Sequence, residues 1–391
     1  MQEWYGWIEI IVALYFLYVV SYTFVFSVAG LFYRNPRPGI PARKRFAVFI
    51  PAYKEDGVIV DVAQRALAQT YPADRFRVVV IADSLMDETV EKLRRLPIDV
   101  VRVSFESSTK VKSLNHAMAT LPDSFDYAVV LDADNIMKPD FLERLDAVHS
   151  AGYRAIQGQR LAKNKDNSMA FLDGLSEAIN NHIYRQGTTA LGLSCSISGS
   201  GVSFDYPLFK KLLGGMTSVG GFDRELEVLL LGRGVPVIYY KDAAVYDEKV
   251  QKTAVFENQR KRWIASQYRY LARYFTKGCK ALLHGDFRYF NSAVLRNIQL
   301  PRLINLGLLF VLPALLYPFR HYLFVNYWIW PGMLGVMILA MALAIPREYY
   351  NKDLLKAALR VPGIFLKMVL LMFKLKGANR KFIHTPHGKT E

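Results

Sequence analysis

Long apolar stretches lie near both ends of the chain, and a region of mixed polarity lies between them. Residues 7–32 are apolar apart from Glu9 and a few hydroxyl groups, which is long enough to cross about 30 Å of hydrocarbon. Residues 303–319 and 323–345 are also apolar, with only the short polar link 320–322 between them. The pattern predicts three membrane spans, of which the last two form a helical hairpin.

The basic residues orient these predicted spans. No Lys or Arg precedes the first span, whereas Arg34, Arg37, Arg43, Lys44 and Arg45 follow it closely. Positive charge collects on the cytoplasmic side, so the central region is expected in the cytoplasm. The basic tail from residue 346 belongs on the same side. We therefore predict a multi-pass protein of the inner (plasma) membrane. The alternative, a cleaved signal peptide, would carry its positive charge in front of a shorter apolar core.

Residues 354–375 have a mixed pattern near the end of the chain. Apolar runs are interrupted by Lys356, Arg360 and Lys367, and Pro362-Gly363 breaks the helical pattern. Proline removes a helical hydrogen bond, and charged residues at this spacing are typical of a helix lying in the membrane interface. We favour an interfacial helix here, with a fourth span as the alternative.

The central region alternates between short β-rich runs and stretches with helical periodicity. The first strands are expected at 46–51, 76–81, 100–103 and 127–131, and the helices between them at 58–69, 87–96 and 110–121. Strands that are apolar throughout belong to a parallel sheet covered on both faces. The sequence therefore predicts an α/β fold with a doubly wound, mostly parallel sheet, whose ligands gather at the carboxyl ends of the strands.

Acidic residues stand at those carboxyl ends. Asp83 follows the second predicted strand, and Asp132 follows the fourth, with Asp134 two residues later. Separate parts of the sequence would thus meet in one crevice. Two carboxylates one residue apart can hold a hard divalent cation that also binds phosphate oxygens.

Five further segments complete the central region. A strand is expected at 154–160 and a long helix at 169–188. The segment Ser198-Gly-Ser-Gly201 indicates either a close backbone approach to a ligand or only a tight turn, since glycine permits both. Asp223 opens a predicted helix at 223–231, where capping is its simplest role. A basic and aromatic helix at 255–275 is typical of one lying along the membrane surface.

The composition supports a membrane protein, and the positions of the basic residues indicate which partners the positive charge serves. The chain is 52% hydrophobic and has a formal net charge of +16, with a mean hydropathy of +0.11. Much of the basic charge flanks the predicted spans, where lipid headgroups account for it. No nucleic-acid motif is evident, so we expect no nucleic-acid partner. Cys195 and Cys279 are too few for a disulfide framework and are expected to be free thiols in a reducing compartment.

Five short motifs, in their order along the chain, resemble a known family. They are Pro51-Ala-Tyr-Lys-Glu55, Ala82-Asp83, Lys110-Val-Lys-Ser-Leu-Asn115, Asp132-Ala-Asp134 and Gln259-Arg-Lys-Arg262-Trp263. Together they resemble the inverting family 2 glycosyltransferases with the GT-A fold, in particular membrane synthases of the cellulose, chitin and hyaluronan type. The resemblance covers about 47–263, and Thr109 replaces a glycine that is usual in the third motif.

The resemblance implies a UDP-sugar donor and a divalent metal, Mg²⁺ or Mn²⁺. Asp134 would hold the metal, and Asp132 would contact the metal or the nucleotide. Asp83 would contact the base of the nucleotide. The other residues expected near the nucleotide are Pro51, Ala52, Tyr53, Glu55, Lys110, Lys112 and Asn115. The sequence does not decide which of the two lysines adds positive charge beside the diphosphate.

The resemblance also implies the catalytic residues. The segment Gly221-Phe-Asp-Arg-Glu-Leu226 is similar to the Gly-Asp-Asp-Arg-x-Leu form of hyaluronan-type synthases, and Asp223 stands eleven residues before Gly234, as in the family. Asp223 is therefore expected to be the catalytic base, with Glu225 as second choice. In Gln259-x-x-Arg262-Trp263, the arginine would stabilise the departing phosphate and the tryptophan would stack on the acceptor sugar.

We expect four parts in the chain. They are a membrane helix at 1–33, a cytoplasmic glycosyltransferase domain at 44–290, a membrane hairpin at 300–345 and an interfacial helix with a basic tail at 346–391. A processive polysaccharide synthase that extends a glycan is expected. Three spans are few for an export pore, so a second copy, a partner subunit or a short product would be needed. The alternatives are transfer of a single sugar to a glycolipid or short glycan acceptor, and a non-enzymatic nucleotide-binding membrane regulator.

Overall fold

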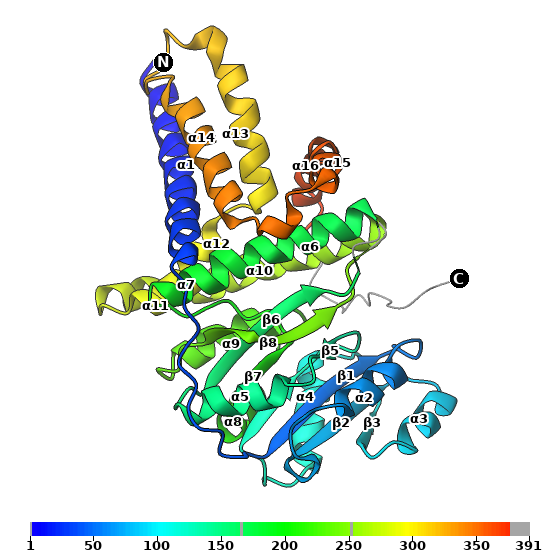
Figure 1. The fold of residues 1–391 in the computed structure, drawn as a ribbon. Helices are drawn as coiled ribbons and strands as arrows, with labels where there is room; N and C mark the ends of the chain where they lie inside the picture. Colours follow the sequence, from blue (N-terminus) through cyan, green and yellow to red (C-terminus); the bar gives the residue numbers. More distant parts are fainter. Residues whose placement is uncertain (1, 165–166, 251–252, 376–391) are drawn as a thin grey trace.

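The chain folds into three layers. The computed structural model describes residues 2–164, 167–250 and 253–375. A group of apolar helices lies at one end, two long helices lie across the middle, and a β-sheet with its own helices lies at the other end (Figure 1). This arrangement places the sheet at a distance from the apolar helices, with the crossing helices between them.

The sheet has eight strands in the described residues, in the order β3-β2-β1-β4-β7-β6-β8-β5. Their bounds are β1 Phe46–Tyr53, β2 Phe76–Asp83, β3 Asp99–Val103, β4 Tyr127–Val130, β5 Ile136–Met137, β6 Ala155–Ala162, β7 Val202–Asp205 and β8 Ile238–Asp247. The first four strands are parallel, and β6 and β8 are parallel to each other. Only β7 and β5 run antiparallel to their neighbours. The predicted α/β fold is thereby confirmed, with a sheet that is mixed, and β5, β7 and β8 were not predicted.

Helices cover both faces of this sheet because alternate strand residues point to opposite sides. One face of the sheet packs against α2, α3 and α5, and the other packs against α4, α8 and α9. The bounds of these helices are α2 Ile59–Leu67, α3 Asp87–Arg94, α4 Lys110–Thr120, α5 Phe141–Ser150, α8 Tyr206–Gly214 and α9 Phe222–Leu231. The β1 and β2 strands pair in register up to Tyr53 opposite Asp83. Their carboxyl ends therefore form one edge.

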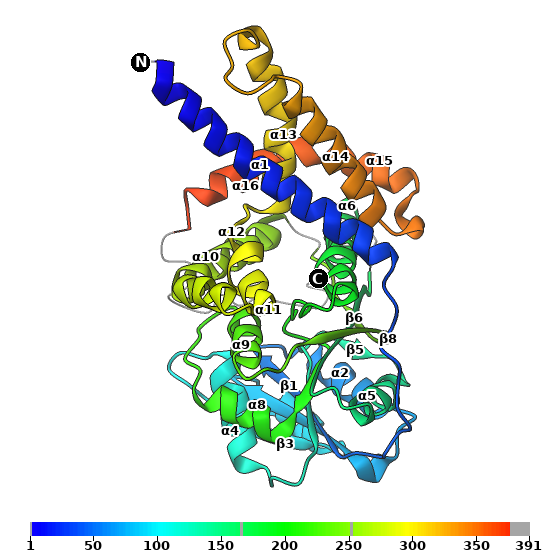
Figure 2. The same ribbon diagram turned by 90° about the vertical axis from the view of Figure 1, so that its left-hand side faces the viewer.

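The middle layer consists of α6 (Ser168–Asn180) and α10 (Thr253–Leu283). Figure 2 shows them nearly end-on, at the same level and on opposite sides of the molecule. The predicted helix at 169–188 ends earlier as an α-helix and continues as a π-helical turn, η2 (Asn181–Gly187), and the short α7 (Thr188–Ala190). The predicted helix at 255–275 is longer than expected, because it continues to Leu283.

The apolar layer is built by α1 (Gln2–Leu31), α13 (Arg302–Leu316) and α14 (Ile329–Ala344). Residues 6–31 and 302–319 are long and apolar enough to cross a membrane, and α14 is shorter. The third predicted span is thus helical only from Ile329. The backbone amides of Phe324 and Val325 donate to the carboxylate of Glu9, at 2.8 and 3.0 Å, and so tie the link between α13 and α14 to α1.

Two short helices replace the single interfacial helix that was expected near the end of the chain. They are α15 (Lys352–Ala358) and α16 (Val361–Met372), and Pro362 lies in the first turn of the second one. Proline fits the first turn of a helix but not its interior, which explains the break. The last part of the predicted basic tail, residues 376–391, lies outside the described residues. The remaining short elements are η1 Ala73–Arg75, α11 Phe287–Phe290, η3 Asn291–Leu295, α12 Arg296–Ile298, η4 Tyr317–Phe319 and η5 Arg347–Tyr349.

Candidate active site

A cavity of about 720 Å³ lies at the carboxyl ends of the central strands and extends between α6 and α10. Most of the residues predicted from the sequence share this cavity, although they come from distant segments. Those that line it are Pro51, Ala52, Tyr53, Glu55, Asp83, Lys110, Asp132, Asp134, Asp223, Gln259, Arg262 and Trp263.

Three predicted residues lie outside the cavity wall, and each has another partner. The ammonium of Lys112 donates to the carbonyl of Ser107 at 2.8 Å. The amide of Asn115 donates to the carbonyl of Leu213 at 2.9 Å and so ties α4 to the end of α8. The buried carboxylate of Glu225 pairs with Arg273 of α10 at 2.7 Å. These contacts give the three residues structural roles in the described chain.

Asp83 is held rigidly at the end of β2. Its side chain is buried, with 1% exposed, and accepts hydrogen bonds from three hydroxyls: Ser84 at 3.1 Å, Ser108 at 3.0 Å and Ser113 at 3.4 Å. Ser84 has a φ of 59°, a left-handed conformation that costs about 1–2 kcal/mol in a residue other than glycine. Such strain is concentrated at functional sites. Here it turns the chain sharply where Asp83 meets the cavity.

Asp132 and Asp134 follow β4 and lie beside a lysine. The ammonium of Lys110, the first residue of α4, pairs with Asp132 and donates to the carbonyl of Gly199 at 2.8 Å. The carboxylate of Asp134 accepts a hydrogen bond from the backbone amide of Glu248 at 3.0 Å. The structure therefore places Lys110, and not Lys112, beside the paired aspartates.

The two aspartates fit a divalent cation that shares its ligands with a phosphate. In the described residues, no three His, Cys, Asp or Glu side chains come together as a metal site. Mg²⁺ binds in many proteins through one or two carboxylates together with substrate phosphates and water. Asp132 and Asp134 supply such a pair of oxygen ligands, and the remaining ligands would come from a diphosphate and from solvent.

Asp223 enters the cavity from the first turn of α9. Gly221 occupies the N-cap with a φ of 68°, and a Cβ there would lie 2.8 Å from the Cβ of Ser266. Asp223 is therefore not the N-cap residue, and the capping role considered from the sequence does not apply. Burial raises the pKa of Asp223 above its ordinary value, although neighbouring Arg224 and Lys110 act to lower it. A carboxylate with a raised pKa is a better proton acceptor.

The segment Ser198-Gly-Ser-Gly201 is a tight turn that also borders the site. Gly199 and Gly201 have φ values of 79° and 61°, which favour glycine. A Cβ on Gly199 would lie 3.8 Å from the Cβ of Asp223, and Ser198 and Gly199 line the cavity. The segment is thus a tight turn on the cavity wall, and a close backbone approach to a ligand stays a prediction.

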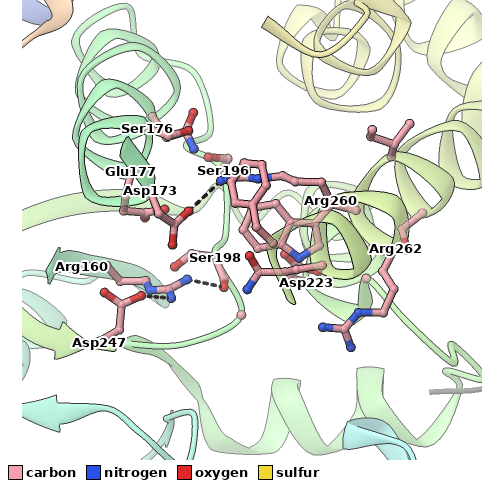
Figure 3. Close-up of a pocket in the computed structure, with 18 of the residues that line it drawn as sticks. Arg160, Asp173, Ser176, Glu177, Ser196, Ser198, Asp223, Asp247, Arg260 and Arg262 are labelled. Atoms are coloured by element: carbon pink, nitrogen blue, oxygen red, sulfur yellow. Dashed lines mark hydrogen bonds and ion pairs between the residues drawn. The ribbon is translucent and has the colours of Figure 1, made fainter. Parts of the chain in front are cut away.

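The aromatic and basic motif from Gln259 to Trp263 lies on α10 and borders the same cavity. The guanidinium of Arg260 lies between the rings of Phe256 and Trp263, at 4.7 and 4.4 Å from their centroids, and pairs with Asp173 of α6 at 2.7 Å. Figure 3 shows this ion pair crossing the cavity, and Arg262 and Asp223 also line its wall. Arg260 therefore covers part of Trp263. The rest of the tryptophan is accessible, and the residue as a whole is 39% exposed.

A family model described as glycosyltransferase-like family 2 matches residues 41–266, which is more than half of the 391 residues. The chain belongs to this glycosyltransferase family. The resemblance inferred from the motifs is confirmed at this level, and the processive type remains a prediction. Comparison with curated proteins gave no match.

This glycosyltransferase is similar to several solved structures. A mannosyltransferase, PcManGT, from Pyrobaculum calidifontis, solved with GDP-Man and Mn²⁺, is 17% identical with a TM-score of 0.52, and the match covers 91% of this chain and 96% of that chain. Glucosyl-3-phosphoglycerate synthase from Mycobacterium tuberculosis, solved with Mn²⁺, UDP and phosphoglyceric acid, is 16% identical with a TM-score of 0.39, covering 56% and 76%. The likeness to PcManGT shows that the two proteins share a fold over nearly the whole of this chain.

The glycosyltransferase also has a buried charge network that the sequence did not predict. Arg160 of β6 pairs with Asp247 of β8 and donates to the carbonyl of Ser198 at 3.2 Å. Lys249 pairs with the same aspartate at 2.8 Å. Figure 3 shows Arg160 and Asp247 on the strand side of the cavity. These residues are far apart in sequence and form no motif, so only the pairing of β6 with β8 brings them together.

A second buried pair fixes the helix that carries Asp223. Glu227 of α9 accepts two hydrogen bonds from Arg296 of α12, at 2.8 and 2.7 Å. Arg224 donates to the side chain of Asn297 at 2.7 Å. Buried charges need such partners, because an unpaired one is costly. These contacts hold α9, and with it the candidate base Asp223, to the short helix α12, which precedes α13.

Proposed function

We propose that this glycosyltransferase is membrane-bound and moves a sugar from a UDP-sugar to an acceptor hydroxyl with inversion of configuration. One observation carries the proposal: Asp83, the pair Asp132 and Asp134, and Asp223 share one cavity. These side chains are suited to a nucleotide, a metal-bound diphosphate and a proton. Parallel-sheet folds collect their ligands at this edge.

The donor would lie along the carboxyl ends of β1, β2 and β4. Asp83 would accept hydrogen bonds from the nucleotide base. Asp132 and Asp134 would hold Mg²⁺ or Mn²⁺, which would neutralise charge on the diphosphate. Lys110 and Arg262, both on the cavity wall, would add positive charge beside the leaving group. A divalent metal is consistent with the neighbours solved with Mn²⁺.

Asp223 would act as the general base. It would take the proton of an acceptor hydroxyl as the acceptor oxygen bonds to the anomeric carbon and the bond from that carbon to the diphosphate oxygen breaks. The nucleoside diphosphate would leave from the opposite face, so the configuration would invert in one displacement. An enzyme nucleophile is not required by this geometry.

A donor panel tests this function. Detergent-purified protein receives UDP-glucose, UDP-N-acetylglucosamine, UDP-galactose or GDP-mannose, with and without Mn²⁺, and the released nucleoside diphosphate and the size of any product are measured. We expect metal-dependent release with one donor. Long products would support the processive synthesis predicted from Gln259 to Trp263, and single additions would support the alternative. Binding of nucleotide without release from any donor would instead support the regulator hypothesis.

The raised pKa of Asp223 predicts the acid side of the pH profile. The base must be deprotonated to act, so turnover should increase with pH through the pKa of Asp223. Because burial places that pKa above the ordinary aspartate value, the half-maximal point should lie above about 3.9. The measurement is kcat against pH at saturating donor. A rate that stays constant down to the ordinary aspartate pKa would contradict the assignment of Asp223.

A further inference from the structure

The cavity has a charged end and an apolar end. The charged end holds the aspartates of the proposed donor site. At the other end, the wall is formed by side chains from α13, α14 and α16. Representative residues of this apolar wall are Leu303, Leu306, Met341, Ile345, Ile364 and Met368. One continuous space therefore joins a site suited to a nucleotide sugar to a site suited to hydrocarbon.

The apolar wall belongs to the layer of apolar helices and not to the sheet domain. Figure 1 shows α13, α14 and α16 on the far side of α6 and α10 from the sheet. Residues 302–319 are long and apolar enough to cross a membrane. The helices α13 and α16 touch closely, because a Cβ on Gly307 would lie 2.2 Å from the ring of Phe365. A soluble sugar would gain nothing from such a wall, whereas a lipid chain would be sheltered by it.

Arg302 stands on the cavity wall where the charged and apolar ends meet. Its guanidinium donates to the side chain of Asn180 at 3.1 Å, and to the carbonyl and hydroxyl oxygens of Ser176, each at 3.2 Å. These partners are neutral, and within the described ranges no ion pair of Arg302 occurs. The nearby Glu177 pairs with Arg185 at 2.7 Å. A guanidinium in this setting suits a phosphate oxygen, which would add charge-assisted hydrogen bonds.

We propose that the acceptor is a lipid-linked sugar that carries a phosphate. Its sugar hydroxyl would lie at Asp223, its phosphate beside Arg302, and its hydrocarbon chain along Leu306 and the other residues of the apolar wall. The transfer step is the one given above: the sugar hydroxyl loses its proton to Asp223, its oxygen bonds to the anomeric carbon, and the nucleoside diphosphate leaves. This inference rests on the proposed function and names the acceptor for the same site.

Three acceptors separate the parts of this proposal, using the full-length protein in detergent. Farnesyl-phosphate-linked glucose has a chain and a phosphate, farnesyl glucoside has only the chain, and glucose 1-phosphate has only the phosphate. We expect the first to give the highest kcat/KM. Equal kcat/KM for glucose 1-phosphate would overturn the role of the apolar wall, and equal kcat/KM for farnesyl glucoside would overturn the role of Arg302.

Paired variants on α13 test the apolar wall. Leu306→Trp should fill the lipid end of the cavity and raise KM for both farnesyl acceptors by about 10-fold or more, because the indole would occupy the space of the hydrocarbon chain. Leu315→Trp is the matched control, because Leu315 is on the same helix but 62% exposed. Ile364→Trp repeats the test from α16 in case the first variant folds poorly. Equal KM values in the wall variants and the control would overturn the proposal.

Arg302→Gln tests the anion contact. It should lower kcat/KM for farnesyl-phosphate-linked glucose by about 10-fold or more, the scale of losing hydrogen bonds to a charged group. Farnesyl glucoside should be unaffected, so the two lipids should become similar. Arg320→Gln, at the exposed far end of the same membrane segment, is the control. An equal loss for both lipids would show a structural effect and would overturn the phosphate contact.

Two readouts separate this proposal from the proposed function. Slow hydrolysis of the donor without acceptor reports on the donor site and should be unchanged in Leu306→Trp. Protection of the protein against thermal unfolding by farnesyl phosphate reports on acceptor binding without catalysis. Absence of nucleoside diphosphate release by the unaltered protein with every donor, with or without each acceptor, would refute the proposed function, whereas protection of Leu306→Trp equal to that of Leu315→Trp would refute the lipid site.

Discussion

Replacing Asp223 with Asn is expected to reduce sugar transfer by about 10²- to 10⁴-fold, the usual contribution of a positioned general base. The amide has nearly the same shape but cannot take the acceptor proton. Donor binding should change little, because a base contributes to the chemical step and not to the affinity for the donor. The measurements are kcat with the preferred donor and the dissociation constant of UDP in the presence of Mn²⁺.

Glu225→Gln is the decisive comparison for this prediction, because Glu225 was the second choice for the base. Its carboxylate is buried against Arg273 and the hydroxyl of Tyr274, outside the cavity wall. The variant should lose about 1–3 kcal/mol of stability, the scale of losing a hydrogen bond to a charged group, because its partner Arg273 is 50% exposed and keeps its contact with water; the folded protein should keep its turnover. Normal transfer by Asp223→Asn, or loss of transfer only in folded Glu225→Gln, would refute the assignment.

Replacing Asp134 with Ala is expected to weaken metal-dependent donor binding by at least about 10-fold, since even groups that only support a metal ligand contribute 10- to 100-fold. The loss should be seen in the presence of Mn²⁺ and should largely disappear without metal. Titration of UDP into the protein with and without Mn²⁺ measures both. The donor hydrolysis rate should decrease in parallel.

Asp242→Asn provides the control for loss of one negative charge. Asp242 is exposed on β8 and does not line the cavity, so UDP affinity should be unchanged with or without Mn²⁺. Equal UDP affinity in Asp134→Ala and the unaltered protein would contradict a metal role for Asp134. Equal weakening with and without metal would show that Asp134 contacts the nucleotide directly.

Topology explains why the acidic residues could be placed from the sequence. Strands β1 to β4 are short apolar runs separated by helices, and this alternation implies parallel strands with a common carboxyl edge. Asp83 and Asp132 follow two such strands and therefore had to lie at that edge. The antiparallel strand β7 and the very short β5 have no comparable pattern, and the long β8 gives no indication of its partner. The charge network of Arg160 and Asp247 depends on that pairing.

Helix geometry explains two choices that the sequence left open. Lys110 and Lys112 are two residues apart on α4, and Asp223 and Glu225 are two residues apart on α9. Residues two apart on an α-helix point about 200° away from each other. Only one member of each pair can therefore face the cavity, but the sequence does not state which face of the helix that is. The packing of α4 and α9 against the sheet decides it.

The family match ends at residue 266, within α10, but the cavity wall continues along the chain to Met368. If the later helices bind the acceptor as proposed, donor chemistry and acceptor choice are encoded in separate stretches of one gene product. Each could then diverge without disturbing the other. A hybrid that keeps residues 41–266 and receives the helices α13 to α16 of another family member should retain its donor and change its acceptor. Substrate range in this architecture would evolve by exchange of the apolar helices.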